Sequence, residues 1–195
     1  MKHKIMEIMR LREEGRQLTG RVEIDDAYLG GALPGGTPGR GSENKVPFIA
    51  AVQTTNDGQP VLVCFAQAPF TKNALSDFAA KSLVRPLTVV SDRLACFAAL
   101  QDAGVHEVTV TGGGAASVKL PQFKAVNTVL GNLNTALTGT YHAFGFSKYA
   151  HRYLAQVQYL FNRRLNLRTI LALLAHAACA THPCPLHAIR AAEPS

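Results

Sequence analysis

The segment VEIDDAYLGG at residues 22–31 places two neighbouring carboxylates, Asp25 and Asp26, inside a stretch that otherwise favours a β-strand. Aspartate is depleted in strands because it fits poorly on a pleated, half-buried surface. A third aspartate, Asp92, follows the apolar run LTVVS at 87–91. Carboxylates gathered at one place can bind Mg²⁺, which prefers oxygen ligands, and the cation offsets the cost of placing these charges together. The pattern therefore indicates a divalent-metal site.

The full ligand set of such a site stays open at this point. Side chains alternate along a strand, so we expect only one of Asp25 and Asp26 to face the site, and alternation alone does not choose between them. No acidic residue stands between Val108 and Ala192, so a ligand from that region must be neutral. The donors available there are Asn127, Asn132, Asn134 and His142. Simpler readings also exist, since Asp92 suits a helix N-cap and Asn127 a surface amide.

The elements that would position these residues follow an alternating order. We predict a helix at 4–17, strands at 20–29, 46–55 and 59–68 with a turn at 56–58, and a helix that Thr71 caps and Pro86 ends. A strand at 87–92, a helix at 93–103 that Gly104 closes, a strand at 106–111 and helices at 121–138, 146–164 and 168–180 complete the chain. This order predicts an α/β protein with a five-stranded mixed sheet in the ribonuclease H-like arrangement.

Composition predicts one domain in an intracellular protein. The 195 residues suffice for one core, no apolar run is long enough to span a membrane, and the charged N-terminus lacks a signal-peptide core. We expect a helical lead-in at 1–19, the main domain at 20–180 and a flexible tail at 181–195. The cysteines are expected to be reduced thiols, although the tail also groups potential zinc ligands. These are Cys179, His182, Cys184 and His187.

The basic charge of the chain is confined to one half. Residues 1–107 hold 12 Lys/Arg and 12 Asp/Glu, so the net charge of +7 arises from the remainder. A long region of one sign favours a polyanion, usually nucleic acid, although a solvated basic surface is the plain alternative. The candidate DNA contacts are Lys124, Asn134, His142, Lys148, Arg152, Arg163, Arg164 and Arg168. No acidic residue within that half can pair with the two adjacent arginines of FNRR.

Several segments together resemble the DDE-type transposases of bacterial insertion sequences. They are RVEIDDAYLGG, GRGSENKVPFIAAV, VVSDRLACF, VNTVLGNLNTALTGTYHAFGFSKYAHRYL and YLFNRRLNLR, spread over residues 4–175. The resemblance is to the group with catalytic Asp, Asp and Asn followed by Lys. It implies that Asp25, Asp92 and Asn127 are the catalytic, metal-binding residues. It further implies two Mg²⁺ (or Mn²⁺) ions, cleavage at element ends, strand transfer into target DNA, and a homo-oligomer on DNA in the bacterial cytoplasm or nucleoid.

The sequence also departs from this family. Asn134 stands where the family has the Lys, Gln156 where it usually has Glu, and Leu160 where it usually has Arg. No zinc ribbon precedes the first predicted strand. These differences favour a truncated or degenerate copy. A DNA-binding remnant without catalysis, and a metal-dependent nuclease of the same fold, remain alternative interpretations.

Overall fold

The structure is a computed structural model that describes residues 1–30, 45–109, 120–141 and 146–191. Contacts within the chain divide it into two compact units. We call Gly15–Tyr28 with Pro47–Thr140 the sheet unit. Met1–Glu14, Leu29–Val46 and Tyr141–Ser195 form the helical unit. No helix among the described residues has both the length and the apolar character needed to cross a membrane.

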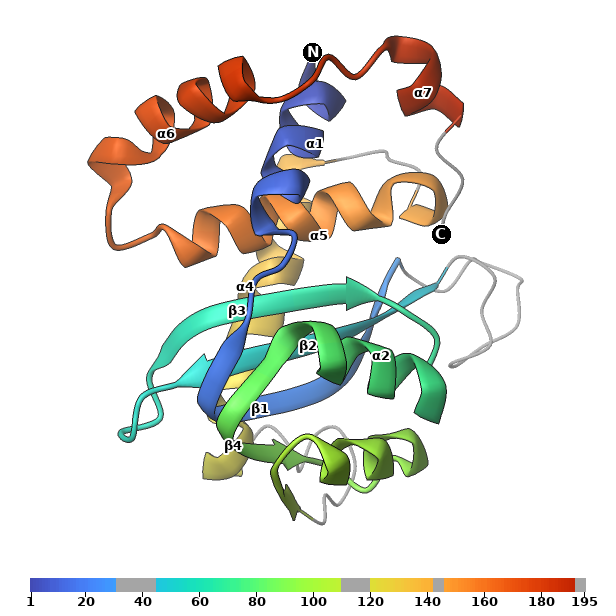
Figure 1. Ribbon diagram of the computed structural model, residues 1–195, viewed down its shortest axis with the longest axis vertical. Coiled ribbons are helices and arrows are strands. Elements are labelled where there is room, and N and C mark those ends of the chain that lie inside the picture. Colours follow the sequence, from blue (N-terminus) through green and yellow to red (C-terminus); the bar gives the residue numbers. More distant parts are fainter. Residues whose placement is uncertain (31–44, 110–119, 142–145, 192–195) are drawn as a thin grey trace. The chain divides into compact units, whose positions relative to one another are not determined.

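The sheet unit is built on five strands in the order β3-β2-β1-β4-β5. Their bounds are Leu18–Leu29 for β1, Val46–Thr54 for β2, Pro60–Gln67 for β3, Leu83–Ser91 for β4 and Val105–Val108 for β5. The pair β2 and β3 is antiparallel, whereas β4 runs parallel to both β1 and β5. Figure 1 shows β2 returning beside β1 in the opposite direction. The mixed sheet and the α/β, ribonuclease H-like arrangement predicted from the sequence are therefore confirmed.

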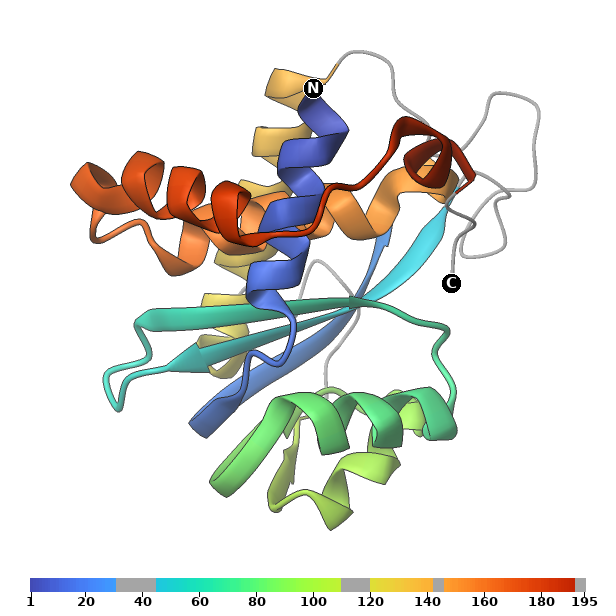
Figure 2. The ribbon, with the colours of Figure 1, turned by 45° about the horizontal axis from the view of Figure 1, so that its top comes forward.

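Helices cover both faces of this sheet. Helix α2 (Lys72–Ser82) and the 3₁₀ helix η2 (Ala95–Asp102) lie on one face, and α4 (Lys124–Thr140) lies on the other (Figures 1 and 2). A short 3₁₀ turn, η3 (Pro121–Phe123), leads into α4. Val22 and Ile24 of β1 are fully buried in the core against α2 and η2. Because side chains alternate along β1, Glu23 and Asp25 belong to the face that α4 covers.

Local details confirm some expected boundaries and correct others. The Thr71 hydroxyl caps α2 by accepting a hydrogen bond from the Ala74 amide at 3.3 Å, and Gly58 closes the predicted turn with a φ of 75°. Pro86 does not end α2, which stops at Ser82; it lies inside β4. There its missing N–H is tolerated because β1 and β4 pair irregularly at this point.

The segment expected to be an α-helix at 93–103 is the 3₁₀ helix η2. Short connecting segments often adopt this tighter helix. It still buries the apolar side chains of Cys96, Phe97 and Leu100. Gly104, expected as a helix-ending residue, lies where the backbone passes close to Leu87. The core contribution of the segment was thus predictable, but the type of helix was not.

The helical unit contains α1 (Lys2–Glu13), α5 (Phe146–Asn162), α6 (Leu167–Ala180) and α7 (Leu186–Ala191). In Figure 1, α1 crosses α5. Two ion pairs link α1 to α5 and to the turn that follows it: Glu7 pairs with the buried Arg152 of α5, and the buried Glu13 pairs with Arg163 just after α5. Helix α7 falls in the segment expected to be a flexible tail, and it buries Ile189. The ion pairs of Glu7 and Glu13 show that the N-terminal lead-in, α1, is a helix packed within this unit.

Candidate metal centre

Three aspartates come together where the second half of β1 lies beside the residue that follows β4. Asp25, Asp26 and Asp92 each offer a carboxylate oxygen, and these oxygens lie within 4.8 Å of one another. The parallel register pairs Glu23 with Val90, so two residues further along each chain Asp25 becomes level with Asp92. All three side chains are half-buried. The structure therefore brings together all three aspartates that the sequence singled out.

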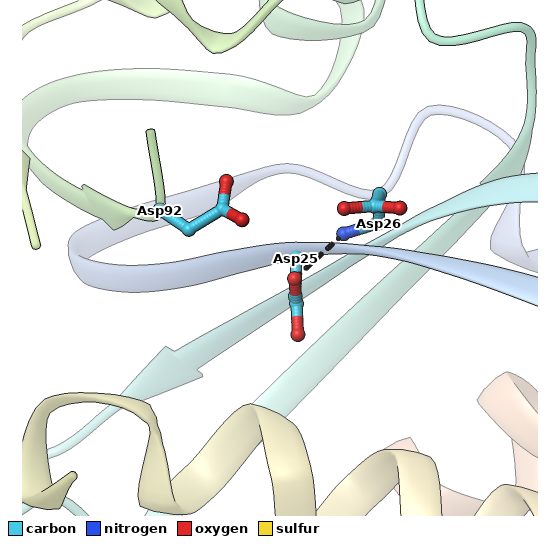
Figure 3. Close-up of side chains that lie close together, drawn as sticks. All are labelled: Asp25, Asp26 and Asp92. Atoms are coloured by element: carbon cyan, nitrogen blue, oxygen red, sulfur yellow. Dashed lines mark hydrogen bonds between the residues drawn. The ribbon is translucent and has the colours of Figure 1, made fainter. Parts of the chain in front are cut away.

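The expectation that only one of the adjacent aspartates could face the site needs correction. Figure 3 shows Asp25 pointing from β1 toward the helix on one side and Asp26 pointing to the other side, as alternation requires. The β1–β4 ladder ends at Glu23 and Val90, so no paired strand separates these carboxylates from Asp92. The Asp26 amide also donates a hydrogen bond to Asp25 Oδ1 at 2.9 Å. Both carboxylates thus reach one site from opposite sides of the strand.

Asp92 has two roles in this geometry. Its Oδ1 accepts a hydrogen bond of 2.9 Å from the Leu94 amide in the turn before η2. The N-cap of η2 is Leu94, so the simpler interpretation of Asp92 as the helix N-cap is not confirmed. Its carboxylate also belongs to the acidic cluster. Burial raises the pKa of the nearby Cys96 thiol, and the charges of Asp26 and Asp92 raise it further. The Cys96 thiol beside the cluster is therefore less acidic than an ordinary cysteine thiol.

A cavity of about 190 Å³ opens beside Asp92. Its lining includes Arg93, Phe97, Gln101 and His106. The His106 Nε2 lies 2.8 Å from the Ser91 hydroxyl, and burial lowers the pKa of this imidazole. The space next to Asp92 thus has an apolar wall, and its polar lining includes the charged Arg93.

Asn127 lies in the first turn of α4 and is half-buried. Its amide nitrogen donates to the Phe123 carbonyl at 2.9 Å, which fixes the orientation of the side chain. The neighbouring Val126 amide donates to Glu23 Oε2 at 2.9 Å. This bond ties the first turn of α4 to β1 two residues before Asp25. Sequence reasoning missed Glu23, although a third acidic residue on an apolar strand was a signal.

The candidate DNA contacts differ in exposure: some are exposed to solvent, and others contact groups within the protein. Lys124, Asn134, Lys148 and Arg168 are exposed, while His142 lies outside the described residues. Arg164 is half-buried, stacks over Phe161 and donates to its carbonyl at 2.9 Å. The exposed cations remain candidates for binding phosphate.

The charges of Arg152 and Arg163 are paired within the protein and are not available to DNA. Arg152 is 3% exposed and donates to Glu7 at 2.7 Å. Arg163 pairs with Glu13 and stacks over Tyr159, with 3.6 Å between the guanidinium carbon and the ring centroid. The sequence reasoning sought acidic partners only within the C-terminal half, whereas α1 supplies them. This arrangement gives no support to DNA contacts by either arginine.

The four cysteines are free thiols in this structure. Cys64 and Cys96 are buried free thiols, and Cys179 is an exposed one. Within the described ranges, the only cluster of three or more potential metal-binding side chains is the aspartate group at β1. The alternative zinc site in the tail is therefore not assembled there.

Residues 17–162 match the ISXO2-like transposase domain, and the match spans the three aspartates and Asn127. The chain belongs to this transposase family. The matched residues end before α6 and α7 begin. No match to the chain was found among curated proteins.

One solved structure similar to this transposase is the Mos1 transposase paired-end complex with left transposon end, at 11% identity and a TM-score of 0.30. The alignment covers 91% of this chain and 61% of that one. At this TM-score the likeness supports no inference about the site.

Proposed function

We propose that this transposase domain catalyses metal-dependent cleavage of DNA at insertion-sequence ends and the transfer of the cut strand into target DNA. The observation that carries the proposal is the gathering of Asp25, Asp26 and Asp92 in a domain of a transposase family. Carboxylate oxygens are the ligands that a hard cation such as Mg²⁺ prefers. The proposed partners of the domain are the DNA substrate and further copies of the same chain, assembled as a homo-oligomer on that DNA.

The residues present fit one or two Mg²⁺ or Mn²⁺ ions. Asp25 and Asp92 supply charged oxygen ligands from two adjacent parallel strands. Asn127 would supply a neutral amide oxygen from the first turn of α4. When bound, such cations activate a water or a DNA 3′-hydroxyl and stabilise the leaving oxygen. Helix α4 contains no acidic residue, so the side-chain amide of Asn127 is the ligand proposed from this helix.

The chain's own part in the reaction is to hold the cleaved phosphate beside the cation that these oxygens would bind. Lys124 is exposed at the start of α4, three residues before Asn127, and can contact a neighbouring phosphate. The backbone link from the Asp26 amide to Asp25 Oδ1 orients the Asp25 carboxylate before any cation arrives. Such preorganisation reduces the reorganisation needed during phosphoryl transfer.

The proposal is tested by Mn²⁺ binding, measured by water-proton relaxation, and by nicking of supercoiled DNA in Mn²⁺. We expect Asp25→Asn and Asp92→Asn to lose both, because each removes a charged ligand. Asp26→Asn should weaken binding less, since its carboxylate points to the side of β1 opposite α4. Asp77→Asn, which removes an exposed carboxylate from α2, is the matched control. Unchanged nicking in both of the first two variants would overturn the proposal.

A second candidate function is DNA binding without catalysis, and Asn134 favours it. This residue is exposed on α4, where the resemblance places a cationic Lys. An amide cannot supply the positive charge that a Lys presents to phosphate. DNA binding that survives in the wild type without Mn²⁺ binding or nicking would select this function. Nicking without strand joining would select a nuclease.

A further inference from the structure

Glu23 is a buried acidic residue that the candidate metal centre does not use. It lies in β1 two residues before Asp25 and is 1% exposed. It is not part of the carboxylate group formed by the three aspartates. A buried carboxylate is costly unless it is paired and hydrogen-bonded, so its bonds indicate its role.

Both oxygens of Glu23 are occupied by partners that lead to α4. Oε2 accepts the Val126 amide at 2.9 Å, and Oε1 accepts Arg21 Nη1 at 2.6 Å. Arg21 in turn donates through Nη2 to the Gln122 carbonyl at 3.1 Å. The amide of Val126 and the carbonyl of Gln122 are four residues apart and would bond each other in a continuous α-helix. Glu23 and Arg21 therefore attach both groups to β1.

The start of α4 needs such a partner. The first amides of a helix have no intrahelical acceptor, and a negative charge there also interacts favourably with the helix dipole. The first turn of α4 contains no acidic residue of its own. Glu23 supplies this charge from the strand, across the interface between sheet and helix. The position of the first turn is consequently set by β1.

The same link joins the two sides of the proposed ligand set. Asp25 follows Glu23 on the same face of β1, and Asn127 follows Val126 in α4. We propose that Glu23 is a positioning residue that holds Asn127 at the metal centre through the Val126 amide, an inference that rests on the proposed function. Glu23 acts through the helix and not as a ligand.

The test is a double-mutant cycle on Mn²⁺ affinity in the full chain, combined with hydrogen exchange of the Val126 amide by NMR. Glu23→Ala should weaken Mn²⁺ binding about tenfold or more, as loss of a residue that orients a ligand commonly does. In an Asn127→Ala background the same change should have no further effect. Glu23→Gln should retain most of the affinity, because its amide oxygen can still accept the Val126 N–H.

Ser82→Ala provides the matched control. Ser82 is buried in the sheet unit and lies next to Cys64, away from α4, so its loss affects general stability alone. We expect this variant to leave Mn²⁺ affinity unchanged. If Glu23→Ala fails to fold, Glu23→Asp replaces it, since its shorter side chain keeps the charge and loses the reach to Val126.

The outcomes separate this inference from the proposed function. Equal losses of affinity with and without Asn127, or no loss at all, would overturn the positioning role. Absence of Mn²⁺ binding in the wild type would instead overturn the proposed metal function. In that case faster exchange of the Val126 amide in Glu23→Ala would still support the attachment of α4 to β1, and unchanged exchange would refute it.

Discussion

Two glycines of the sheet unit differ in whether the structure has room for a side chain at their positions. A Cβ at Gly104 would lie 2.5 Å from the Leu87 carbonyl oxygen, so this position requires the absence of a side chain. A Cβ at Gly131, within α4, would meet nothing within 4 Å. In a helix interior glycine is less favourable than alanine because it loses more conformational freedom on folding. The packing therefore requires glycine at position 104, whereas alanine at position 131 is expected to stabilise the protein.

Gly104→Ala should destabilise the protein by about 1–3 kcal/mol, because the backbone beside Leu87 must move to admit a methyl group. Gly131→Ala should stabilise it by about 0.5–1 kcal/mol through helix propensity. Urea denaturation followed by circular dichroism measures both. Equal effects of the two substitutions would contradict the close packing at Gly104.

At the scale of elements, the sequence predicted the sheet better than the contacts between helices. Alternation and turn residues such as Gly58 located the strands, and the order of elements led to the mixed sheet. The pairing of Glu13 with Arg163 joins residues 150 positions apart, which no local pattern reveals. The role of Glu23 was hidden for the same reason. The shared site of Asp25 and Asp26 depended on where the β1–β4 ladder ends, which alternation does not specify.

The attachment of α1 to α5 should depend strongly on Arg163. The Glu13 carboxylate is 3% exposed and also accepts hydrogen bonds from Gln158 and Asn162. Arg163→Met leaves this buried charge without its cationic partner, which should cost about 3 kcal/mol. The double variant Glu13→Leu with Arg163→Met should cost less than Arg163→Met alone. Additive losses in urea denaturation would argue against a buried pair.

The helical unit should also lose stability as the pH falls. Burial lowers the pKa of His3 and His151 below their ordinary value of 6.5, and Nδ1 of each ring is buried without a hydrogen-bond partner. Burial would raise the pKa of Glu7, but hydrogen bonds from Arg152 and Arg10 outweigh it and lower this pKa below 4.5. In each case the unfolded chain binds the proton more readily, so the stabilisation is complete above the unfolded pKa and decreases below it.

Two phases are therefore expected in the urea midpoint as a function of pH. The first begins below about pH 6.5, where the histidines of the unfolded chain become protonated. The second begins below about pH 4.5, where Glu7 of the unfolded chain becomes protonated. A His3→Phe, His151→Phe variant should show a smaller first phase, because His106 of the sheet unit, whose pKa burial also lowers, still contributes to it, and should keep the second phase. A first phase of unchanged size in this variant would assign it to other groups.

At the scale of the whole molecule, the charge available for DNA is smaller than the sequence indicates. The net charge is +7, and the basic residues responsible lie in the C-terminal half. The structure pairs Arg152 and Arg163 with acidic residues of α1. Lys124, Lys148 and Arg168 are exposed. Electrostatic binding to DNA should therefore depend on the exposed residues and not on the total count.

Lys148→Gln and Arg168→Gln should each make the dependence of log K for DNA binding on log salt shallower by about one, the value for one lost phosphate contact. Arg152→Gln should leave this slope unchanged in any variant that remains folded, because its charge is already paired. Fluorescence anisotropy with labelled duplex DNA at several salt concentrations gives the slopes. A shallower slope for folded Arg152→Gln would show that the buried arginine reaches DNA.

The crowding of Asp25, Asp26 and Asp92 also links folding to the surrounding cation concentration. The three negative charges repel one another in the native state, whereas in the unfolded chain Asp92 separates from the other two. A cation that binds only the native protein stabilises it by about 2.7 kcal/mol at a concentration one hundred times its Kd. Under the proposed function, chelation would therefore lower the melting temperature as well as stop catalysis. Under that function, Mg²⁺ in a cell would raise the folded fraction of this transposase above the fraction in a chelated buffer.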